Sequence, residues 1–378
     1  MQVAQAVLCK TSDCSRDLVR LAEIAPNLIL AFASVECIPL AAAHLAEAFP
    51  SACRVGCSTA GEISNEGVSN ARCVVTAVRF DKTHMVEVVT RLASMEDSLS
   101  AGRRLGDQLP KAGLRAVWLI GQGVSINGSA LVAGLTEILG TSVPVTGGLA
   151  GDDGLFRQTW VLTSGGVDDR VVVALGLYGD HLVFNHGSFG GWKPFGPARK
   201  VTRCSGNVLF ELDGEPALAI YKRYLGDYAT GLPASGLLFP FSMLGRNHDE
   251  IGLIRTILGV NEDDGSLTLA GEIDPDGHLK LMRSSTDALV GGAETAAEAA
   301  LGSEPVDGDG LALLVSCVGR KLVMGERVDE EVEAVADIFG RQIARAGFYS
   351  YGEICPSHSG DECRLHNQTM TITYLAER

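Results

Sequence analysis

One pattern occurs three times in the chain and limits the folds open to it. A short, almost wholly apolar run leads into a polar or glycine-bearing turn and then into apolar residues at helical spacing. The three segments are 27–63, 116–153 and 311–354. Such a run predicts a strand that is buried on both faces, and each segment has the length of a strand–helix–strand unit. We therefore expect an α/β protein with repeated strand–helix–strand units.

Each segment closes on a glycine followed by an acidic residue, at Gly61-Glu62, Gly151-Asp152 and Gly352-Glu353. The recurrence of this pair favours an internal repeat over a chance resemblance between glycine-rich segments. The runs 73–80, 171–179 and 369–377 alternate in polarity and are rich in β-branched residues, so they predict further strands. Together these features indicate mixed sheets.

The length of 378 residues suits two domains. Glycine and proline are dense over residues 187–203, and a new apolar run begins at Val208. We expect two related α/β domains, over residues 27–195 and 205–378.

Charge and hydropathy exclude some classes of partner. The net charge of −15 argues against nucleic acid and anionic membranes. No apolar run approaches 18 residues and the first residues lack the apolar core of a signal peptide, so we expect no membrane insertion. The ten cysteines are then better explained as reduced, mostly buried side chains of a cytoplasmic protein.

The turn 56–64, "GCSTAGEIS", directly follows an apolar strand. Small polar side chains at strand ends of α/β sheets commonly face a ligand crevice. Cys57 would be a nucleophile only with a base nearby, and the sequence identifies none. A ligand-lining turn and a purely structural turn both remain open, and the P-loop, G-x-S-x-G and H-E-x-x-H motifs are absent from the sequence.

Near the C-terminus Cys355, His358, Cys363 and His366 follow the pattern C-x2-H-x4-C-x2-H. Three explanations stay open: a four-ligand zinc site, a loop without metal, or the use of one member in ligand or haem binding. His186, beside aromatic residues and glycines, is a second candidate for lining a pocket or ligating haem.

Several segments in order resemble one family: "GCSTAGEI", "GGLAGDD", "GWKPFGP", "ELDGEPALAIYKRYLG", "SCVGR", "GFYSYGEI" and "LHNQTMTITYL". They are similar to the N- and C-terminal halves of the FIST domain, a bacterial sensory module. The resemblance implies a small-molecule sensor without catalysis, of the stand-alone type that regulates a separate signalling partner such as a histidine kinase. Amino acids are the ligand class proposed for the family, and one subset senses nitric oxide through bound haem.

The resemblance and the strand-end turns together predict a ligand site. Its expected members are Cys57, Ser58, Thr59, Glu62, Asp152, Tyr349, Glu353, His366 and Asn367. For haem, the expected iron ligands are His366 or His186, and zinc on the Cys/His quartet is the lesser alternative. The competing hypothesis is an enzyme that uses the Cys57 turn or a metal held by the C-terminal Cys/His loop.

Overall fold

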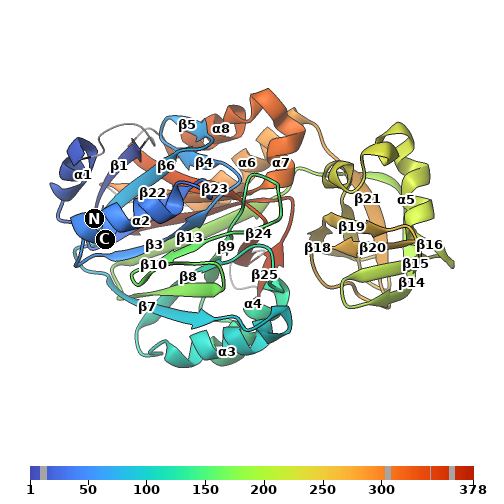
Figure 1. Cartoon of the computed structure of the whole chain (residues 1–378), viewed down its shortest axis with the longest axis horizontal. Coiled ribbons are helices and arrows are strands. Elements are labelled where there is room, and N and C mark those ends of the chain that lie inside the picture. The colour runs from blue at the N-terminus through green and yellow to red at the C-terminus, as the bar shows by residue number, and fades with distance from the viewer. Residues whose placement is uncertain (9–14, 303–307, 341, 357–361) are drawn as a thin grey trace.

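The computed structural model describes residues 1–8, 15–302, 308–340, 342–356 and 362–378. Figure 1 shows a large body and a smaller lobe beside it. The lobe consists of residues 193–283, and the body contains the other described residues. Both chain ends lie in the body, on the side away from the lobe.

The body repeats one order of elements three times: strand, helix, strand, helix, strand, hairpin, strand. In the third unit two consecutive helices stand in the place of the second helix. The first unit comprises β1 (Gln2–Leu8), α1 (Ser15–Ala22), β2 (Leu28–Ala33), α2 (Ile38–Ala48), β3 (Cys53–Ser58), β4 (Glu62–Ser64), β5 (Gly67–Ser69) and β6 (Cys73–Arg79). The second comprises β7 (His84–Arg91), α3 (Ser98–Gln108), β8 (Leu114–Gly121), α4 (Gly128–Leu139), β9 (Val145–Leu149), β10 (Val161–Thr163), β11 (Gly166–Asp168) and β12 (Val171–Tyr178). The third comprises β13 (Leu182–Phe189), α6 (Thr286–Leu301), β22 (Gly310–Cys317), α7 (Val318–Met324), α8 (Asp329–Phe339), β23 (Ile343–Ser350), β24 (Gly352–Pro356), β25 (Cys363–His366) and β26 (Met370–Glu377).

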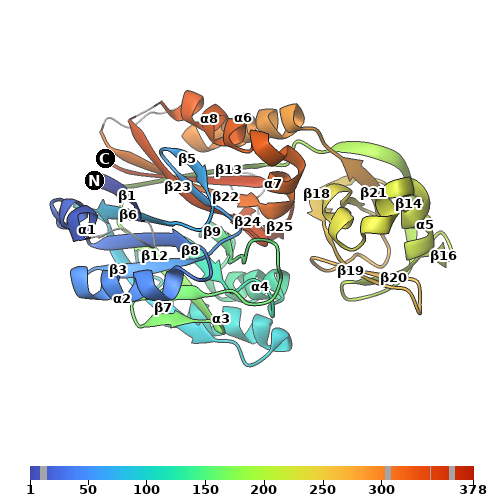
Figure 2. The same ribbon diagram turned by 45° about the horizontal axis from the view of Figure 1, so that its top comes forward.

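Strand pairing repeats in the same way. In each unit one strand pairs in parallel with the strand after the second helix and antiparallel with the closing strand: β2 with β3 and β6, β8 with β9 and β12, and β22 with β23 and β26. The opening strand then extends the sheet beyond the closing one. The expected α/β class with repeated units and mixed sheets is confirmed. The helices lie on the outside of the body, with α6 and α8 together over one side (Figure 2).

The units are interlocked because each gives its hairpin to another unit's sheet. The β4–β5 hairpin pairs with β23, the β10–β11 hairpin with β3, and the β24–β25 hairpin with β9. Residues from both expected domains therefore share sheets. After β3, β9 and β23 the chain crosses directly to the sheet of a neighbouring unit. These crossings bring the ends of the three strands together.

Side chains along the parallel strands alternate between two buried layers. In β8, Trp118 and Ile120 face a core enclosed by the sheets of all three units, whereas Val117 and Leu119 face the outer core with the helices. The same alternation along β2 and β22 explains why these strands are apolar without a break, since both faces are buried. Stacked Phe32 and Phe348 lie in the inner core with ring centroids 4.9 Å apart.

Three equivalent glycines allow the parallel strands to approach one another. Gly56, Gly147 and Gly347 stand opposite Ala31, Leu119 and Leu314 in the register of the three parallel pairs. A Cβ at each glycine would lie 1.8–1.9 Å from the carbonyl oxygen of the facing residue. A side chain at any of the three positions would force the strands apart.

The lobe interrupts the third unit between β13 and α6. It comprises β14 (Lys193–Ser205), β15 (Val208–Leu212), β16 (Glu215–Pro216), α5 (Ala217–Leu225), β17 (Phe241–Leu244), β18 (Glu250–Arg255), β19 (Ile257–Asn261), β20 (Ser266–Leu269) and β21 (His278–Arg283). Its antiparallel strands and α5 enclose a separate apolar core. The boundary expected at residues 195–205 falls within β14, where the chain enters the lobe. No helix in the described part of the chain is long and apolar enough to cross a membrane.

Candidate functional site

The three strand-end turns named by the sequence meet in the body. Ala60 donates its backbone N–H to the carbonyl oxygen of Tyr349 at 2.9 Å, and Tyr349 donates to that of Gly61 at 2.8 Å. Gly151 donates to the carbonyl oxygen of Ser58 at 2.9 Å. The turns therefore converge as expected, but backbone hydrogen bonds close the junction between them.

All three acidic residues at this junction accept hydrogen bonds from nearby donors, and those of Glu62 and Asp152 lie within turns of the body. Glu62 accepts hydrogen bonds from the hydroxyls of Thr59 and Ser69, and burial raises its pKa. Asp152 accepts from the backbone N–H groups of residues 156–158 and from the hydroxyl of Tyr351. Both carboxylates thus stabilise turns of the body.

Ser58 and Tyr349 also serve the body. The Ser58 hydroxyl donates to the carbonyl oxygen of Gly151 and accepts from the N–H of Trp160. The Tyr349 hydroxyl donates to Glu331, which forms a fully buried ion pair with Arg320 at 2.7 Å. These side chains hold strands and helices together and do not face an open space.

Cys57 lies in the inner core and is fully buried. Burial raises the pKa of its thiol well above the ordinary value, and a nucleophilic cysteine needs a thiolate. The sequence pattern assigned Cys57 to a turn that faces a ligand, but Cys57 belongs to β3, where side chains alternate between the two faces, and its side chain points into the inner core.

The described members of the C-terminal Cys/His quartet point to different partners. The Cys363 thiol donates to the carbonyl oxygen of Val145 at 3.1 Å, and the Cys355 sulfur lies 3.6 Å from Nδ1 of His186. Burial raises the pKa of both thiols. Within the described ranges no three Cys, His, Asp or Glu side chains are arranged to hold a metal ion. His358 lies outside those ranges.

An open space lies between body and lobe, beside the C-terminal residues 362–369. It is a cleft of about 660 Å³ lined by the end of β13, by β18 of the lobe, and by side chains from residues 362–369. We call it the polar cleft. Clefts of this size between domains commonly bind small molecules. Of the nine expected ligand-binding residues, His366 lines it directly.

The protonation of His366 follows from its surroundings. Its Nε2 lies 2.9 Å from the carbonyl oxygen of Cys355, which can only accept, so Nε2 carries the proton. Burial lowers the pKa of His366 to about 4. The ring is therefore neutral near pH 7 and leaves Nδ1 as a hydrogen-bond acceptor.

Glu353 lies behind the cleft and acts through Thr369. Thr369 lines the cleft and donates both its N–H and its hydroxyl to Glu353 Oε2, at 3.1 and 3.0 Å, while Ser350 donates to Oε1 at 2.6 Å. Burial raises the pKa of Glu353 to about 8, so it is mostly protonated near pH 7. Glu353 therefore supports the cleft wall.

Gln368, which directly precedes Thr369, joins the lobe to the body. Gln368 has a left-handed backbone with φ of 64° and donates from Nε2 to the carbonyl oxygen of Leu237 and to the hydroxyl of Thr256, both at 3.0 Å. Its neighbour Asn367 is buried, and Asn367 Oδ1 has no hydrogen-bond partner among the described residues. The two hydrogen bonds of Gln368 hold the lobe against the body.

Charged residues of the polar cleft were missed by the sequence analysis. Arg364 and Glu362 lie on one wall, and Glu250 of β18 lies on the lobe wall. Arg364 precedes His366 by two residues, so strand alternation would have placed it on the same face. Glu250 had no such signal, because the approach of β18 to β25 is set by tertiary structure. His186, the other haem candidate, lies 3.6 Å from the Cys355 sulfur and is not among the residues that line the cleft.

Comparison with known proteins agrees with the sequence resemblance. The family model of the FIST N domain matches residues 27–215, and that of the FIST C domain matches residues 217–356. A protein of Methanocaldococcus jannaschii described as uncharacterized is 35% identical over 101 residues, which are 26% of this chain and 19% of that protein. The chain thus spans about a fifth of the length of this relative.

Solved structures of cyanuric acid hydrolases also align with the chain. That from A. caulinodans covers 100% of this chain and 99% of its own, with a TM-score of 0.37 and 10% identity. A second one aligns with a TM-score of 0.35 and 11% identity.

Proposed function

The chain belongs to the FIST family, and from this premise we propose that it senses a small zwitterionic molecule of the amino-acid class. The ligand binds in the polar cleft, and the bound state regulates a separate signalling protein such as a histidine kinase. The observation that carries the proposal is a cleft of about 660 Å³ with both signs of charge on walls supplied by body and lobe.

The side chains of the cleft suit such a ligand. Arg364 offers planar N–H donors to a carboxylate. Glu250 and Glu362 offer acceptors to an ammonium group. Neutral His366 adds an acceptor at Nδ1, and Phe189, which is 48% exposed, adds apolar surface for the ligand's side chain.

The position of the cleft provides a route from binding to signalling. A ligand that touches Arg364 on the body and Glu250 on the lobe favours conformations in which these walls are close. The lobe connects to the body at β14 and after β21, so a change in its position alters the outer surface seen by a partner. The proposal assigns no catalytic role to the chain, and the burial of Cys57, the candidate nucleophile, supports this part of the proposal.

Haem is the second candidate, and His366 supports it. Its Nε2–H donates to a backbone carbonyl, the arrangement by which proteins commonly orient a metal-ligating histidine with its other nitrogen free. Bound haem would supply a site for nitric oxide. The charged walls of the cleft fit a porphyrin less well than a zwitterion, because a macrocycle needs broad apolar contact, so we rank haem second.

A thermal-shift screen of the amino acids tests the proposal, with haem titration followed by its Soret absorbance in parallel. We expect at least one amino acid to raise the melting temperature of the wild type. Arg364→Ala should abolish the shift, because the carboxylate loses its cation. Arg223→Ala, on the lobe helix α5 in an exposed ion pair with Glu215, should keep it.

Three outcomes decide between the candidates. A shift that Arg364→Ala abolishes and Arg223→Ala keeps supports the zwitterion site. A Soret band lost in His366→Ala, with no amino-acid response, replaces it with the haem site. No response to either probe contradicts the sensory role of the polar cleft.

A further inference from the structure

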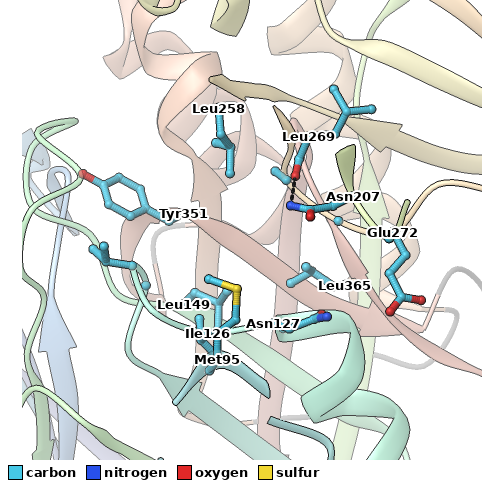
Figure 3. A pocket seen from close by; sticks show the side chains of 16 residues that line it. Met95, Ile126, Asn127, Leu149, Asn207, Leu258, Leu269, Glu272, Tyr351 and Leu365 are labelled. Atoms are coloured by element: carbon cyan, nitrogen blue, oxygen red, sulfur yellow. Dashed lines mark hydrogen bonds between the residues drawn. The ribbon is translucent and has the colours of Figure 1, made fainter. Parts of the chain in front are cut away.

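A second cleft separates body and lobe, and its walls differ in chemistry from those of the polar cleft. It has a volume of about 160 Å³. The body contributes Met95, Ile126 and Leu149, and the lobe contributes Leu258 from β19 and Leu269 from β20. Figure 3 shows the two groups facing each other, with Leu365 between them. We call this space the apolar cleft.

One strand divides the two clefts. Along β25, Arg364 and His366 line the polar cleft, and Leu365 lines the apolar cleft. Successive side chains of a strand point to opposite faces, so the two clefts lie on opposite faces of β25. They are therefore two distinct spaces, and a ligand of one does not have to occupy the other.

Apolar side chains at the apolar cleft are left exposed. Met95 is 43% exposed and Leu258 is 44% exposed, although both belong to the lining and neither belongs to a core of the protein. Large apolar side chains on facing walls of a cleft gain contact when an apolar molecule lies between them. Their exposure leaves apolar surface that an occupant of the cleft would cover.

The lining also indicates which kind of molecule this is. A fully apolar cavity of about 150 Å³ accepts a benzene-sized molecule, so the volume here suits a single small ring system. Asn127, Asn207 and Glu272 are grouped at one end of the cleft, and the Tyr351 hydroxyl on the opposite side is already hydrogen-bonded to Asp152 (Figure 3). Asn207 Nδ2 donates to the carbonyl oxygen of Leu269 at 2.8 Å, which leaves its Oδ1 to accept from a ligand.

We propose that the apolar cleft is a second ligand site, specific for a small aromatic molecule that carries one hydrogen-bond donor, of the indole or phenol type. The ring lies between Met95 of the body and Leu258 of the lobe. The hydrogen-bond donor of the ligand points toward the amide oxygen of Asn207 and the carboxylate of Glu272. The site does not use the charges of the polar cleft, so it holds whether or not an amino acid binds there.

Indole is the probe that tests this site, added to the whole chain with methyl groups labelled for NMR. We expect saturable shifts of the Leu269 and Leu365 methyl signals with a Kd on the order of 1 mM or below, as suits a ligand of this size. Leu258→Asp should weaken binding about tenfold or more, because it replaces an apolar contact by a charge. Since Leu258 is exposed, this variant should fold.

Two control variants make the result specific. Leu322→Asp changes a leucine of α7 that is 51% exposed, against 44% for Leu258, and lines neither cleft, so this variant should bind indole as the wild type does. Arg364→Ala should also leave indole binding unchanged. The proposal is overturned if indole gives no saturable shifts at those methyl groups, or if Leu258→Asp binds as tightly as Leu322→Asp.

Discussion

Replacing Glu353 by glutamine should remove the pH dependence of stability that this side chain contributes. Burial raises the pKa of Glu353 to about 8 in the native chain, from 4.5 when exposed. Between these values the native state keeps a proton that the unfolded state has lost. Stability is then greatest below pH 4.5 and falls as the pH rises toward 8, by about 1.4 kcal/mol for each pH unit.

His366 contributes a pH dependence of stability with the opposite sign, and this sets the pH range in which the contribution of Glu353 can be measured. Its pKa is lowered by burial from 6.5 to about 4, so it makes stability fall as the pH drops below 6.5. The two contributions oppose each other between pH 4.5 and pH 6.5. Above pH 6.5 only that of Glu353 remains, and the free energy of unfolding should fall by about 2 kcal/mol from there to pH 8.

The assay is urea denaturation of the wild type and Glu353→Gln at several pH values from 6.5 to 8. Glutamine keeps the size of the side chain and can accept from Thr369, so the variant should fold and should lose the slope. Glu298→Gln, at an exposed position of α6, should keep the slope of the wild type. A wild type without a slope, or a variant with the same slope, would refute the reasoning.

Two further predictions concern the packing of the body. Gly347→Ala brings a Cβ to 1.8 Å from the carbonyl oxygen of Leu314, so it should lower the free energy of unfolding by about 4 kcal/mol or more in a urea titration. Gly291→Ala, at a position of α6 with open space around it, should raise the free energy of unfolding by up to about 1 kcal/mol in the same titration. Equal effects of the two would contradict the close approach of β22 and β23. Arg320→Met should cost about 3–5 kcal/mol because Glu331 remains buried without its cation, and adding Glu331→Leu should recover much of this loss. If the double variant is as unstable as the single one, the ion pair is not the cause.

The fold was predictable where the signal is local. Three strand–helix–strand units can be predicted from the apolar runs of β2, β8 and β22 and from the helical spacing after each run. A strand that is buried on both faces requires an unbroken apolar run. The hairpin exchange was not predictable. The pairing of β4 with β23 joins residues almost 300 positions apart, and no local pattern specifies it.

The candidate site was predictable only in part for the same reason. Sequence identified the acidic residues at the three turns, but their roles depend on donors elsewhere in the chain, such as Tyr351 for Asp152 and Thr369 for Glu353. Those hydrogen bonds orient the carboxyl groups, and no local sequence pattern specifies them. The polar cleft needs the lobe as its second wall, so Glu250 became a candidate only in three dimensions.

A crystal structure of the whole chain with the amino acid that gives the largest thermal shift tests the central claim most directly. The proposal predicts ligand density in the polar cleft, with the carboxylate on Arg364, the ammonium group beside Glu250 or Glu362, and His366 within hydrogen-bond distance. Ligand density that lies only away from these residues, with the polar cleft free of ligand, would contradict the proposal.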